Sequence, residues 1–498
     1  MTPLQKACDS AARFQPEVLL TVAMLVVVVI DSIRARWRDA ANFTITAAAL
    51  LAAGVLALQT PRDHFRPLWD GMVTLDSVSV FFKVLLIGAS FLVLLMFRRS
   101  RELAGLVLSE FYALLLAVTL SNILLATSND IAMLYLALEM VSVTSYVMVA
   151  YMKGDKLSNE ASLKYILFGA VSTGVMLYGL TLLYGLTGTT SLPGIRDVLA
   201  SGIPDESRVA LYVIALLVFA GFGFKTAAVP FHFWCPDVYQ GAPTPVTAFL
   251  SVAPKAAGFA VMMRFFYSGL ATPVTGPFDL ATDIIDWRPM LSLVCVLTMT
   301  VGNIAALTQT NMKRLLAYSS IAHAGYILMG VIAASQNGAR SIMMYLLVYV
   351  FMNLGAFLVV TLIHYHDGSF DLRDYPGLYR RSPVLTIAMS LFLLSLMGIP
   401  PLIGFMGKFY VFAAAVQSGL VWLAVVGALN AAVGAYYYAR VLKTMVIDAG
   451  NEDKAPITLP PLEYAYVVAL VAANVLPLLF WNTIEGWTMA SLRLYAGR

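Results

Sequence analysis

The chain has 498 residues, of which 60% are hydrophobic and only 12% are charged. A water-soluble domain carries roughly 25% charged residues, so this composition excludes a soluble protein of the same length. The apolar residues form continuous runs of about 20, which predict transmembrane helices and exclude the alternating strands of a membrane barrel. The formal net charge of +4 says little, because the distribution of charge among the loops sets the orientation.

The hydrophobic runs predict fourteen transmembrane spans and leave no room for a separate soluble domain. In chain order, the spans lie near residues 16–34, 40–59, 75–97, 106–127, 130–151, 160–187, 209–235, 242–267, 289–309, 313–334, 340–364, 383–415, 419–446 and 461–482. The expected fold class is therefore an all-α polytopic membrane protein.

The loops on one side of the predicted bundle hold more Lys and Arg than the loops on the other side. This assignment places Lys313 among the richer loops and Arg264 among the poorer ones. Because basic loops are retained in the cytoplasm, the richer side is predicted to be cytoplasmic. An even number of spans then predicts that both termini are periplasmic.

Five lysines belong to no loop, namely Lys83, Lys164, Lys225, Lys255 and Lys408. A lysine at the centre of a membrane helix costs about 2.5–3.5 kcal/mol on insertion scales, so a chain that keeps several uses them or pairs them with acids. Lys83 lies within about two turns of its helix start, and we expect its side chain to extend to the membrane interface in a structural role. The other four lie deeper and are functional candidates.

Glu139 is the acid that lies deepest within a predicted span, and Lys164 begins the next span after a short loop. Adjacent antiparallel helices place these two side chains at comparable depths, which predicts an ion pair between them. Two interpretations remain open at this point. The pair is either static and only neutralises both charges, or it modulates the electrostatic field along a proton path.

Deep lysines lie beside prolines: Lys225 precedes Pro230, and Lys408 follows Pro400 and Pro401. Proline removes a backbone donor and bends a helix. In a membrane, a broken helix is tolerated only where protein or a water-filled cavity satisfies the freed groups. Lysines beside broken spans therefore indicate transport rather than packing.

Two histidines in the predicted spans, His232 and His323, titrate near neutral pH without assistance. His232 lies two residues after Pro230, and His323 lies in "AYSSIAHAGYILMG". Each is a possible proton relay. The alternative interpretation is a histidine that only hydrogen-bonds a neighbouring helix.

An internal repeat appears at an offset of 180 residues, at which "EMVSVTSYVMV" overlays "SSIAHAGYILM". With the same offset, Lys225 falls three residues from Lys408, and each lies by a break. This pattern predicts two inverted repeats of five helices. Because Ser319 occupies the slot of Glu139, the two halves are not equivalent.

No nucleotide, redox cofactor or metal site is predicted in the chain. The piece "GFGFKT" is similar to a phosphate-binding loop, but Phe224 precedes Lys225 and no predicted strand precedes the glycines. The three cysteines are far apart and form no CxxC pair, so a cluster or disulfide framework is not expected. The expected surroundings are the lipid bilayer, with no nucleic acid.

Two long segments carry a resemblance to a known family: "GFGFKTAAVPFHFWCPDVYQGAPTPVTAFLSVAPKAAG" and "LFLLSLMGIPPLIGFMGKFY". They resemble the proton-translocating antiporter-like subunits of respiratory complex I, the bacterial NADH:quinone oxidoreductase (NDH-1). The length without a long C-terminal lateral extension, and a lysine at Lys408 where subunit M has a glutamate, favour the subunit N (chain 2) family. The resemblance covers essentially the whole chain.

The resemblance implies two inverted five-helix repeats with discontinuous seventh and twelfth helices. We expect a three-helix segment at 1–105, repeats at 106–267 and 289–446, and a C-terminal helix at 447–498. It also implies a row of charged residues across the membrane midplane, to which Glu139, Lys164, Lys225, Lys255 and Lys408 correspond. His232 and His323 lie where the family often has relay groups.

The resemblance further implies a bacterial inner-membrane subunit that moves protons from cytoplasm to periplasm, among other membrane subunits of the complex. FMN, iron–sulfur clusters, NADH and quinone would be bound by other subunits, so this chain is part of an enzyme without its own redox centre. Protons are expected to enter near Lys225, pass Lys255 and leave by Lys408. Alternatives are a multi-subunit cation/proton antiporter, a related membrane hydrogenase or ferredoxin-linked photosynthetic complex, and a structural scaffold, which gives no reason for four deep lysines.

Overall fold

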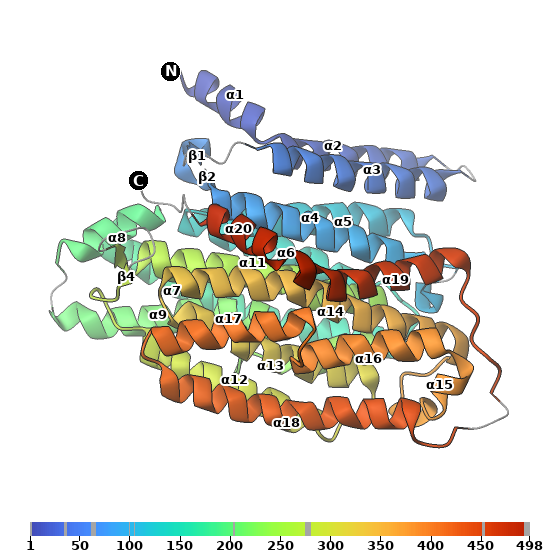
Figure 1. Cartoon of the computed structure of the whole chain (residues 1–498). Coiled ribbons are helices and arrows are strands. Elements are labelled where there is room, and N and C mark those ends of the chain that lie inside the picture. The colour runs from blue at the N-terminus through green and yellow to red at the C-terminus, as the bar shows by residue number, and fades with distance from the viewer. Residues whose placement is uncertain are drawn as a thin grey trace.

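Long helices running side by side make up most of the protein (Figure 1). The computed structural model describes residues 2–33, 37–60, 66–98, 100–103, 105–202, 205–273, 280–450 and 454–492. Within these residues, thirteen helical segments are long and apolar enough to cross a membrane. Two shorter apolar helices are broken halves of one further crossing, so the predicted count of fourteen spans is confirmed.

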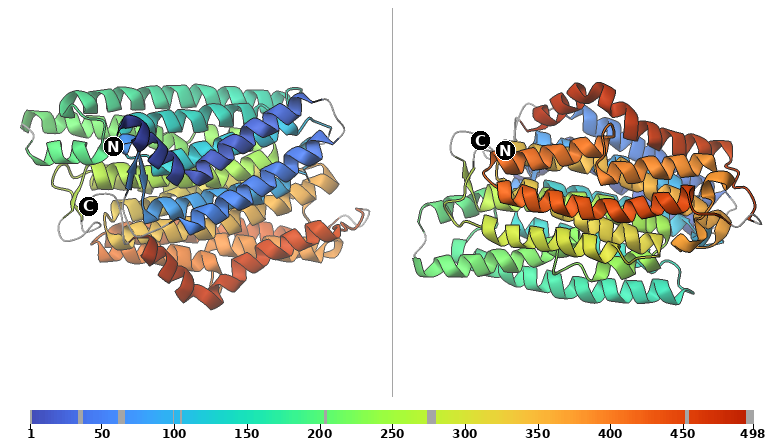
Figure 2. Two further views of the ribbon diagram at one scale, coloured as in Figure 1. Left: turned by 90° about the horizontal axis from the view of Figure 1, so that it is seen from above. Right: turned by 60° about the horizontal axis from the view of Figure 1, so that its bottom comes forward.

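The spans, in chain order, are α2 (Gln15–Ser32), α3 (Arg38–Gln59), α4 (Ser77–Phe97), α5 (Ser109–Thr127), α6 (Ile131–Val149), α7 (Lys156–Thr187), α9 (Asp205–Thr226), α11 (Thr244–Arg264), α12 (Arg288–Ala306), α13 (Met312–Ile332), α14 (Gln336–Asp367), the halves α16 (Pro383–Met397) and α17 (Ile403–Gln417), α18 (Val421–Val446), and α19 (Pro461–Val475) with α20 (Trp481–Ser491). The last crossing bends at η5 (Leu476–Phe480) between α19 and α20, as the right-hand view of Figure 2 shows.

Short elements connect the spans. The helical ones are α1 (Pro3–Arg13), η1 (Trp69–Gly71), η2 (Arg101–Leu103), α8 (Leu192–Ala200), α10 (Trp234–Gly241), η3 (Phe265–Gly269), η4 (Leu372–Asp374) and α15 (Leu378–Arg381). Two small antiparallel hairpins pair β1 (Arg66–Leu68) with β2 (Val73–Leu75) and β3 (Thr272–Pro273) with β4 (Leu280–Ala281). Neither hairpin leads directly into the segment of Lys225, which lies at the end of the helix α9.

The repeat is visible in matching helices. α7 and α14 each contain 32 residues and begin 180 residues apart. Each ends at a glycine in the left-handed conformation, Gly188 and Gly368. Glycine suits this terminal position because a Cβ would be strained there. The identical length and cap support the offset found in the sequence.

The loops around these helices also match. An isolated bridge joins Asp130 to Ser191 in the first repeat, and another joins Asn311 to Asp371 in the second. Each bridge ties the start of the repeat's second helix to the chain that follows its third. Because five spans are an odd number, the second repeat begins on the opposite side of the bundle. This is the inverted arrangement that was predicted.

Two spans are broken midway. α9 ends at Thr226, and the chain is non-helical until α10 begins at Trp234, with Pro230 inside the gap. α16 ends before Gly398, and α17 begins at Ile403 after two prolines. The breaks place helix ends, with their unpaired backbone groups, in the interior of the bundle.

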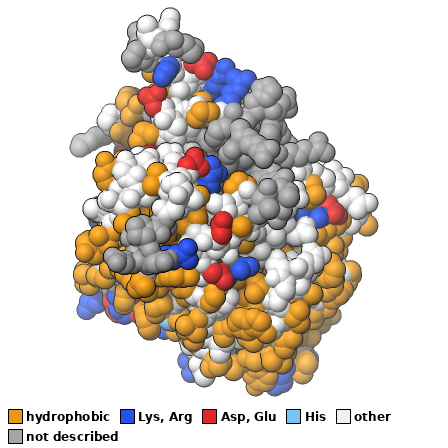
Figure 3. Space-filling model, turned by 90° about the vertical axis from the view of Figure 1, so that its left-hand side faces the viewer, with side chains coloured by type: hydrophobic (Ala, Val, Ile, Leu, Met, Phe, Trp, Pro, Cys, Tyr) orange, Lys and Arg blue, Asp and Glu red, His pale blue; other side chains and the backbone are white. Residues whose placement is uncertain are grey.

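The core lies around α11, of which every residue is buried, and beside α13 and α14. The outer helices carry exposed apolar side chains, as expected for lipid contact. Figure 3, which looks at the end of the bundle near α8, shows hydrophobic side chains over much of the surrounding surface.

Candidate functional site

Lys225 lies in the last turn of α9, directly before the first break. Its side chain is buried, and its Nζ atom donates a hydrogen bond of 3.0 Å to Ser142 Oγ on α6. The Lys225 ammonium is also within electrostatic range of Glu139, one turn earlier on α6. The break thus presents a lysine to a hydroxyl and to the carboxylate of a facing helix.

Lys164 does not make the ion pair expected from the sequence. Its Nζ atom lies 2.6 Å from Asp237 Oδ2 and 2.7 Å from Glu160 Oε1, and these two carboxylates are its ion-pair partners among the described residues. The reason is the break, because the half-helix α10 that follows it carries Asp237 to α7. Glu139 instead interacts with Lys225.

Asp237 joins the two repeats and was missed in the sequence. Besides contacting Lys164 on α7, it accepts a hydrogen bond of 2.6 Å from Arg314 Nη1 near the start of α13. Arg314 also donates to Gln240 Oε1 at 2.9 Å. An acid seven residues after Pro230, in an otherwise apolar run, was the available signal.

Lys255 lies in the middle of α11 and is fully buried. Its Nζ atom donates to Ser320 Oγ at 2.6 Å and to the Ser320 carbonyl at 3.0 Å. Tyr349 of α14 donates to the same Ser320 hydroxyl at 2.9 Å. Since a hydroxyl both accepts and donates, Ser320 links Lys255 to the second repeat.

His323 lies one turn after Ser320 on α13 and uses both ring nitrogens. Nδ1 is 2.7 Å from the Tyr345 hydroxyl, and Nε2 is 3.1 Å from the Tyr438 hydroxyl. Tyr438 is also hydrogen-bonded to the Ser319 hydroxyl. The sequence analysis did not single out the tyrosines of this site. For Tyr345 and Tyr349 a signal was available, because their four-residue spacing places both on one face of a helix.

The ring of His323 is within electrostatic range of both Lys255 and Lys408. Lys408, on α17, donates a hydrogen bond of 2.7 Å to the carbonyl of Met397, the last residue of α16. Its ammonium also lies 5.1 Å from the centre of the Tyr326 ring. A lysine here is favoured by the negative end of the α16 dipole.

His232 lies in the first break, outside both half-helices. Its ring packs 4.4 Å from that of Phe233, and its Nδ1 atom is buried without a hydrogen-bond partner among the described residues. The described hydrogen bonds do not link His232 to Lys225. Of the two histidines, His323 is therefore the one that lies within electrostatic range of lysines of the row.

Lys83 does not extend to the membrane interface. It is almost fully buried, and its Nζ atom lies 2.5 Å from the buried carboxylate of Glu17 on α2. The expectation was wrong because Glu17, in the first turn of α2, packs at the same depth as Lys83 on α4. The pair fastens the N-terminal helices to the bundle.

Two basic residues that were assigned to loops lie inside the protein. Arg264 is completely buried at the end of α11 and binds both carboxylate oxygens of Asp76, at 2.8 and 2.9 Å. Lys313 is buried at the start of α13, where it contacts the Ala242 carbonyl at 2.6 Å and Glu102 at 3.4 Å. Neither residue belongs in a count of loop charges.

Comparison with known proteins identifies the family of this chain. A family model described as NADH:quinone oxidoreductase/Mrp antiporter, transmembrane, matches residues 128–434. The chain belongs to this family. The matched region contains both breaks and every lysine discussed above except Lys83.

Individual known proteins match this chain in sequence or in structure over nearly its whole length. It is 46% identical over 510 residues to NADH-quinone oxidoreductase subunit N of Anaeromyxobacter sp. (strain Fw109-5), covering 98% of each chain. A chain in respiratory complex I from Thermus thermophilus with bound aureothin is similar with a TM-score of 0.79 and 31% identity, over 95% of this chain and 99% of that one. A chain of the Mrp complex from Dietzia sp. DQ12-45-1b shares the fold, with a TM-score of 0.76, 20% identity and 97% coverage of both.

Proposed function

We propose that this chain is the antiporter-like, membrane-arm subunit of an NADH:quinone oxidoreductase and that it translocates protons from cytoplasm to periplasm. NADH oxidation and quinone reduction in other subunits drive this movement. The observation that carries the proposal is the buried row of ionisable groups at two helix breaks, in a chain nearly half identical to a protein named as subunit N. Ionisable residues within a membrane mark ion pathways because their burial is otherwise costly.

The proposed path enters at Lys225, passes Lys255 and His323, and leaves by Lys408. Its centre holds two hydrogen-bonded groups, Lys255 with Ser320 and Tyr349, and His323 with Tyr345 and Tyr438. The rings of Tyr349 and His323 lie 5.3 Å apart, so the two groups are in contact. Hydroxyl and imidazole groups both donate and accept, which proton transfer requires. Glu139 sets the electrostatic field at Lys225, and Lys164 modulates that field from α7.

The chain would act as a translocase subunit without a redox centre of its own, surrounded by other membrane subunits. FMN and iron–sulfur clusters would belong to those other subunits. In the proposed orientation the chain lies in a bacterial inner membrane with its more basic loops in the cytoplasm and both termini in the periplasm. Residues 1–105 and 447–498 would flank the two repeats. His232 stands as a further relay candidate in the first break.

The test replaces Lys225 or Glu139 by Ala in the assembled complex and measures proton pumping and electron transfer together. We expect pumping to be lost in both variants, because each removes a charge at the proposed entry. Wild-type pumping in both would overturn the assignment. Copurified flavin and iron–sulfur subunits would distinguish this function from that of a cation/proton antiporter, which would copurify with membrane subunits alone.

A further inference from the structure

The interval between Lys225 and Lys255 is the part of the proposed path that α11 itself does not bridge. Lys225 packs against α11 at Gly258, where an added Cβ would lie 3.4 Å from Cγ of the lysine. Between Lys255 and Gly258, the sequence of α11 holds only Ala256 and Ala257, whose side chains neither donate nor accept a proton. A proton that moves between the two lysines through side chains therefore needs groups from other helices.

The Lys225 end of this interval is continuous with hydroxyl groups of α6 and α7. Lys225 donates a hydrogen bond of 3.0 Å to Ser142, and the hydroxyl of Tyr146, one turn later on α6, also interacts with Ser142. The Tyr146 ring meets the ring of Tyr165 on α7 edge to face, with 4.8 Å between the ring centres. Gly169 of α7 makes this approach possible, because an added Cβ would overlap the Tyr146 hydroxyl. Two tyrosines thus lead from Ser142 to α7.

The Lys255 end of the interval is reached from α10, the half-helix after the first break. Tyr239 on α10 is fully buried, and Nζ of Lys255 lies 5.9 Å from the centre of its ring. The Tyr239 hydroxyl interacts with the Ser320 hydroxyl and with the Cys235 thiol. Ser320 itself accepts the hydrogen bond of 2.6 Å from Lys255. α10 therefore brings a phenol and a thiol to the hydroxyl that holds Lys255.

Tyr165 and Cys235 join the two ends. The buried Tyr165 hydroxyl is within electrostatic range of the Cys235 thiol and of the Tyr146 hydroxyl. Trp234, directly before Cys235, stacks on the Tyr165 ring with 4.5 Å between the ring centres. Its Nε1 atom donates a hydrogen bond of 3.1 Å to the carbonyl of Phe224, in the last turn of α9. The stacking and the hydrogen bond hold α10 against α7 and α9, so the two ends keep a fixed relation.

We propose that a side route of hydroxyl and thiol groups carries the proton between the two lysines. In order from Lys225 to Lys255, its members are Ser142, Tyr146, Tyr165, Cys235, Tyr239 and Ser320. Each member accepts a proton from the group before it and releases its own proton to the next. One N–H bond of Lys225 breaks, one N–H bond of Lys255 forms, and the members between them end unchanged. This inference rests on the proposed function, because it names the residues of one step in that path.

The test removes single hydroxyls from the assembled complex. Tyr165→Phe and Tyr239→Phe keep each ring and lose the group that passes the proton. We expect either variant to slow proton pumping about tenfold or more, because a positioned proton-transfer group typically contributes about 100-fold or more. Each variant should also show a larger solvent deuterium isotope effect on pumping than the wild type, since proton transfer then limits the rate. A tyrosine with a merely structural role would not change the isotope effect.

Two glycines of α7 provide an independent pair of variants. Gly169→Ala should displace the Tyr146 hydroxyl and slow pumping severalfold. Gly174→Ala is its matched control, because an added Cβ there has no heavy atom within 4 Å. Both variants place alanine inside the same helix, so the contact with Tyr146 separates them.

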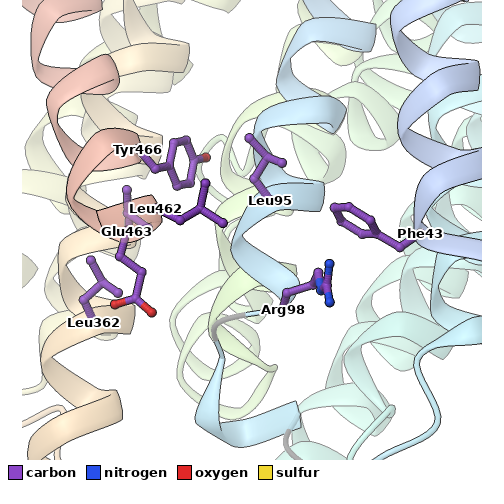
Figure 4. Close-up of a pocket in the computed structure, with 8 residues that line it drawn as sticks. Phe43, Leu95, Arg98, Leu362, Leu462, Glu463 and Tyr466 are labelled. Atoms are coloured by element: carbon purple, nitrogen blue, oxygen red, sulfur yellow. The ribbon is translucent and has the colours of Figure 1, made fainter. Parts of the chain in front are cut away.

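Tyr466→Phe is the matched control for the two phenylalanine variants. Tyr466 lines a pocket of about 460 Å³ between α3, α4, α14 and α19, drawn in Figure 4, to which no residue of the proposed path contributes. Its hydroxyl donates a hydrogen bond of 2.6 Å to the Leu92 carbonyl. The variant therefore loses a hydrogen bond of a membrane tyrosine but no proton step, and pumping should stay at the wild-type rate.

Lys225→Ala, measured alongside, separates this inference from the proposed function. Loss of pumping in Lys225→Ala with wild-type pumping in Tyr165→Phe and Tyr239→Phe would overturn the side route and leave the proposed function standing. Wild-type pumping in Lys225→Ala as well would overturn the proposed function itself. A Tyr466→Phe variant as slow as Tyr239→Phe would also overturn the side route. Native gels report assembly, and if a tyrosine variant does not assemble, equal pumping rates in the two α7 alanine variants would overturn the route.

The measurements use inverted vesicles that contain the complete complex. Proton pumping and NADH oxidation are recorded together in H₂O and in D₂O.

Discussion

At the scale of single residues, the deep lysines differ in the chemistry of their partners. Lys164 lies between two carboxylates, whereas Lys225 and Lys255 donate to serine hydroxyls. A carboxylate holds an ammonium in place by charge, while a hydroxyl can pass a proton onward. This difference supports a modulating role for Lys164 and a proton-carrying role for the other two. Asp237 therefore becomes a positioning residue for the proposed modulation.

Asp237→Asn should reduce proton pumping about tenfold, if one charge-assisted hydrogen bond at Lys164 is lost. The reason is that Lys164 and Arg314 would keep their charges while losing the carboxylate they share. Pumping in inverted vesicles, measured per NADH oxidised, checks this. The control is Glu160→Gln, which removes the more exposed partner of Lys164 and should have a smaller effect because water screens it. Equal effects of the two variants would contradict the role of Asp237.

The buried pair of Lys83 and Glu17 allows a prediction about stability. Removing one partner of a buried ion pair leaves an uncompensated charge and costs about 3–5 kcal/mol. Lys83→Ala should therefore lower the unfolding temperature clearly. The double variant Lys83→Met/Glu17→Leu should recover most of the loss, because apolar replacements of a buried pair are often neutral. Thermal unfolding of the purified complex measures both, and a double variant as unstable as the single one would refute the pair's role.

At the scale of elements, the helix breaks set where the lysines lie. Gly398 ends α16 with a φ of 87°, and a Cβ added to it would lie 2.7 Å from Cδ of Lys408. Glycine suits this position for two reasons. It adopts the left-handed backbone conformation without strain, and it leaves room for the lysine side chain. The second break thus depends on a small residue as much as on its prolines.

Gly398→Ala should displace Lys408 and reduce proton pumping at least severalfold. Gly419→Ala is the matched control, because Gly419 also has a positive φ of 78° but has no heavy atom within 4 Å of its added Cβ. Both variants pay roughly 1 kcal/mol of backbone strain, so only the contact with Lys408 separates them. Pumping in vesicles is the measurement. The same pumping rate in the two variants would mean that the position of Lys408 tolerates displacement.

At the scale of the whole molecule, the spans and the repeat were predictable because the bilayer sets helix length and forbids unpaired backbone groups. The row of lysines was visible because charges inside apolar runs are costly. Their partners were not predictable, since Asp237 reaches Lys164 only through the geometry of the break. Arg264 and Lys313 were misplaced because they lie at the ends of apolar runs, where sequence does not separate a loop from a buried helix end.

Glu102 connects the N-terminal three-helix segment to both repeats and gives the molecule a pH-dependent contact. Its carboxylate accepts a hydrogen bond of 2.7 Å from the Thr244 amide at the start of α11 and faces Lys313 of α13 and, farther away, His364 of α14. Burial alone would raise the pKa of Glu102. The nearby Lys313 charge and the Thr244 hydrogen bonds outweigh it, so the pKa is lowered from 4.5.

A carboxyl group with a lowered pKa in the folded state adds stability above its unfolded pKa, and this contribution disappears as the pH falls through the folded value. Glu102→Gln should therefore lower the free energy of unfolding by roughly 1.5–3 kcal/mol at pH 7. Below the ordinary pKa of 4.5 the difference from wild type should shrink as Glu102 itself becomes protonated. Unfolding temperatures of both proteins at a series of pH values test this. The contrary result is a difference in stability between the variant and the wild type that stays constant into the acid range. That result would show that hydrogen bonding and packing, and not the carboxylate charge, hold the N-terminal segment to the two repeats.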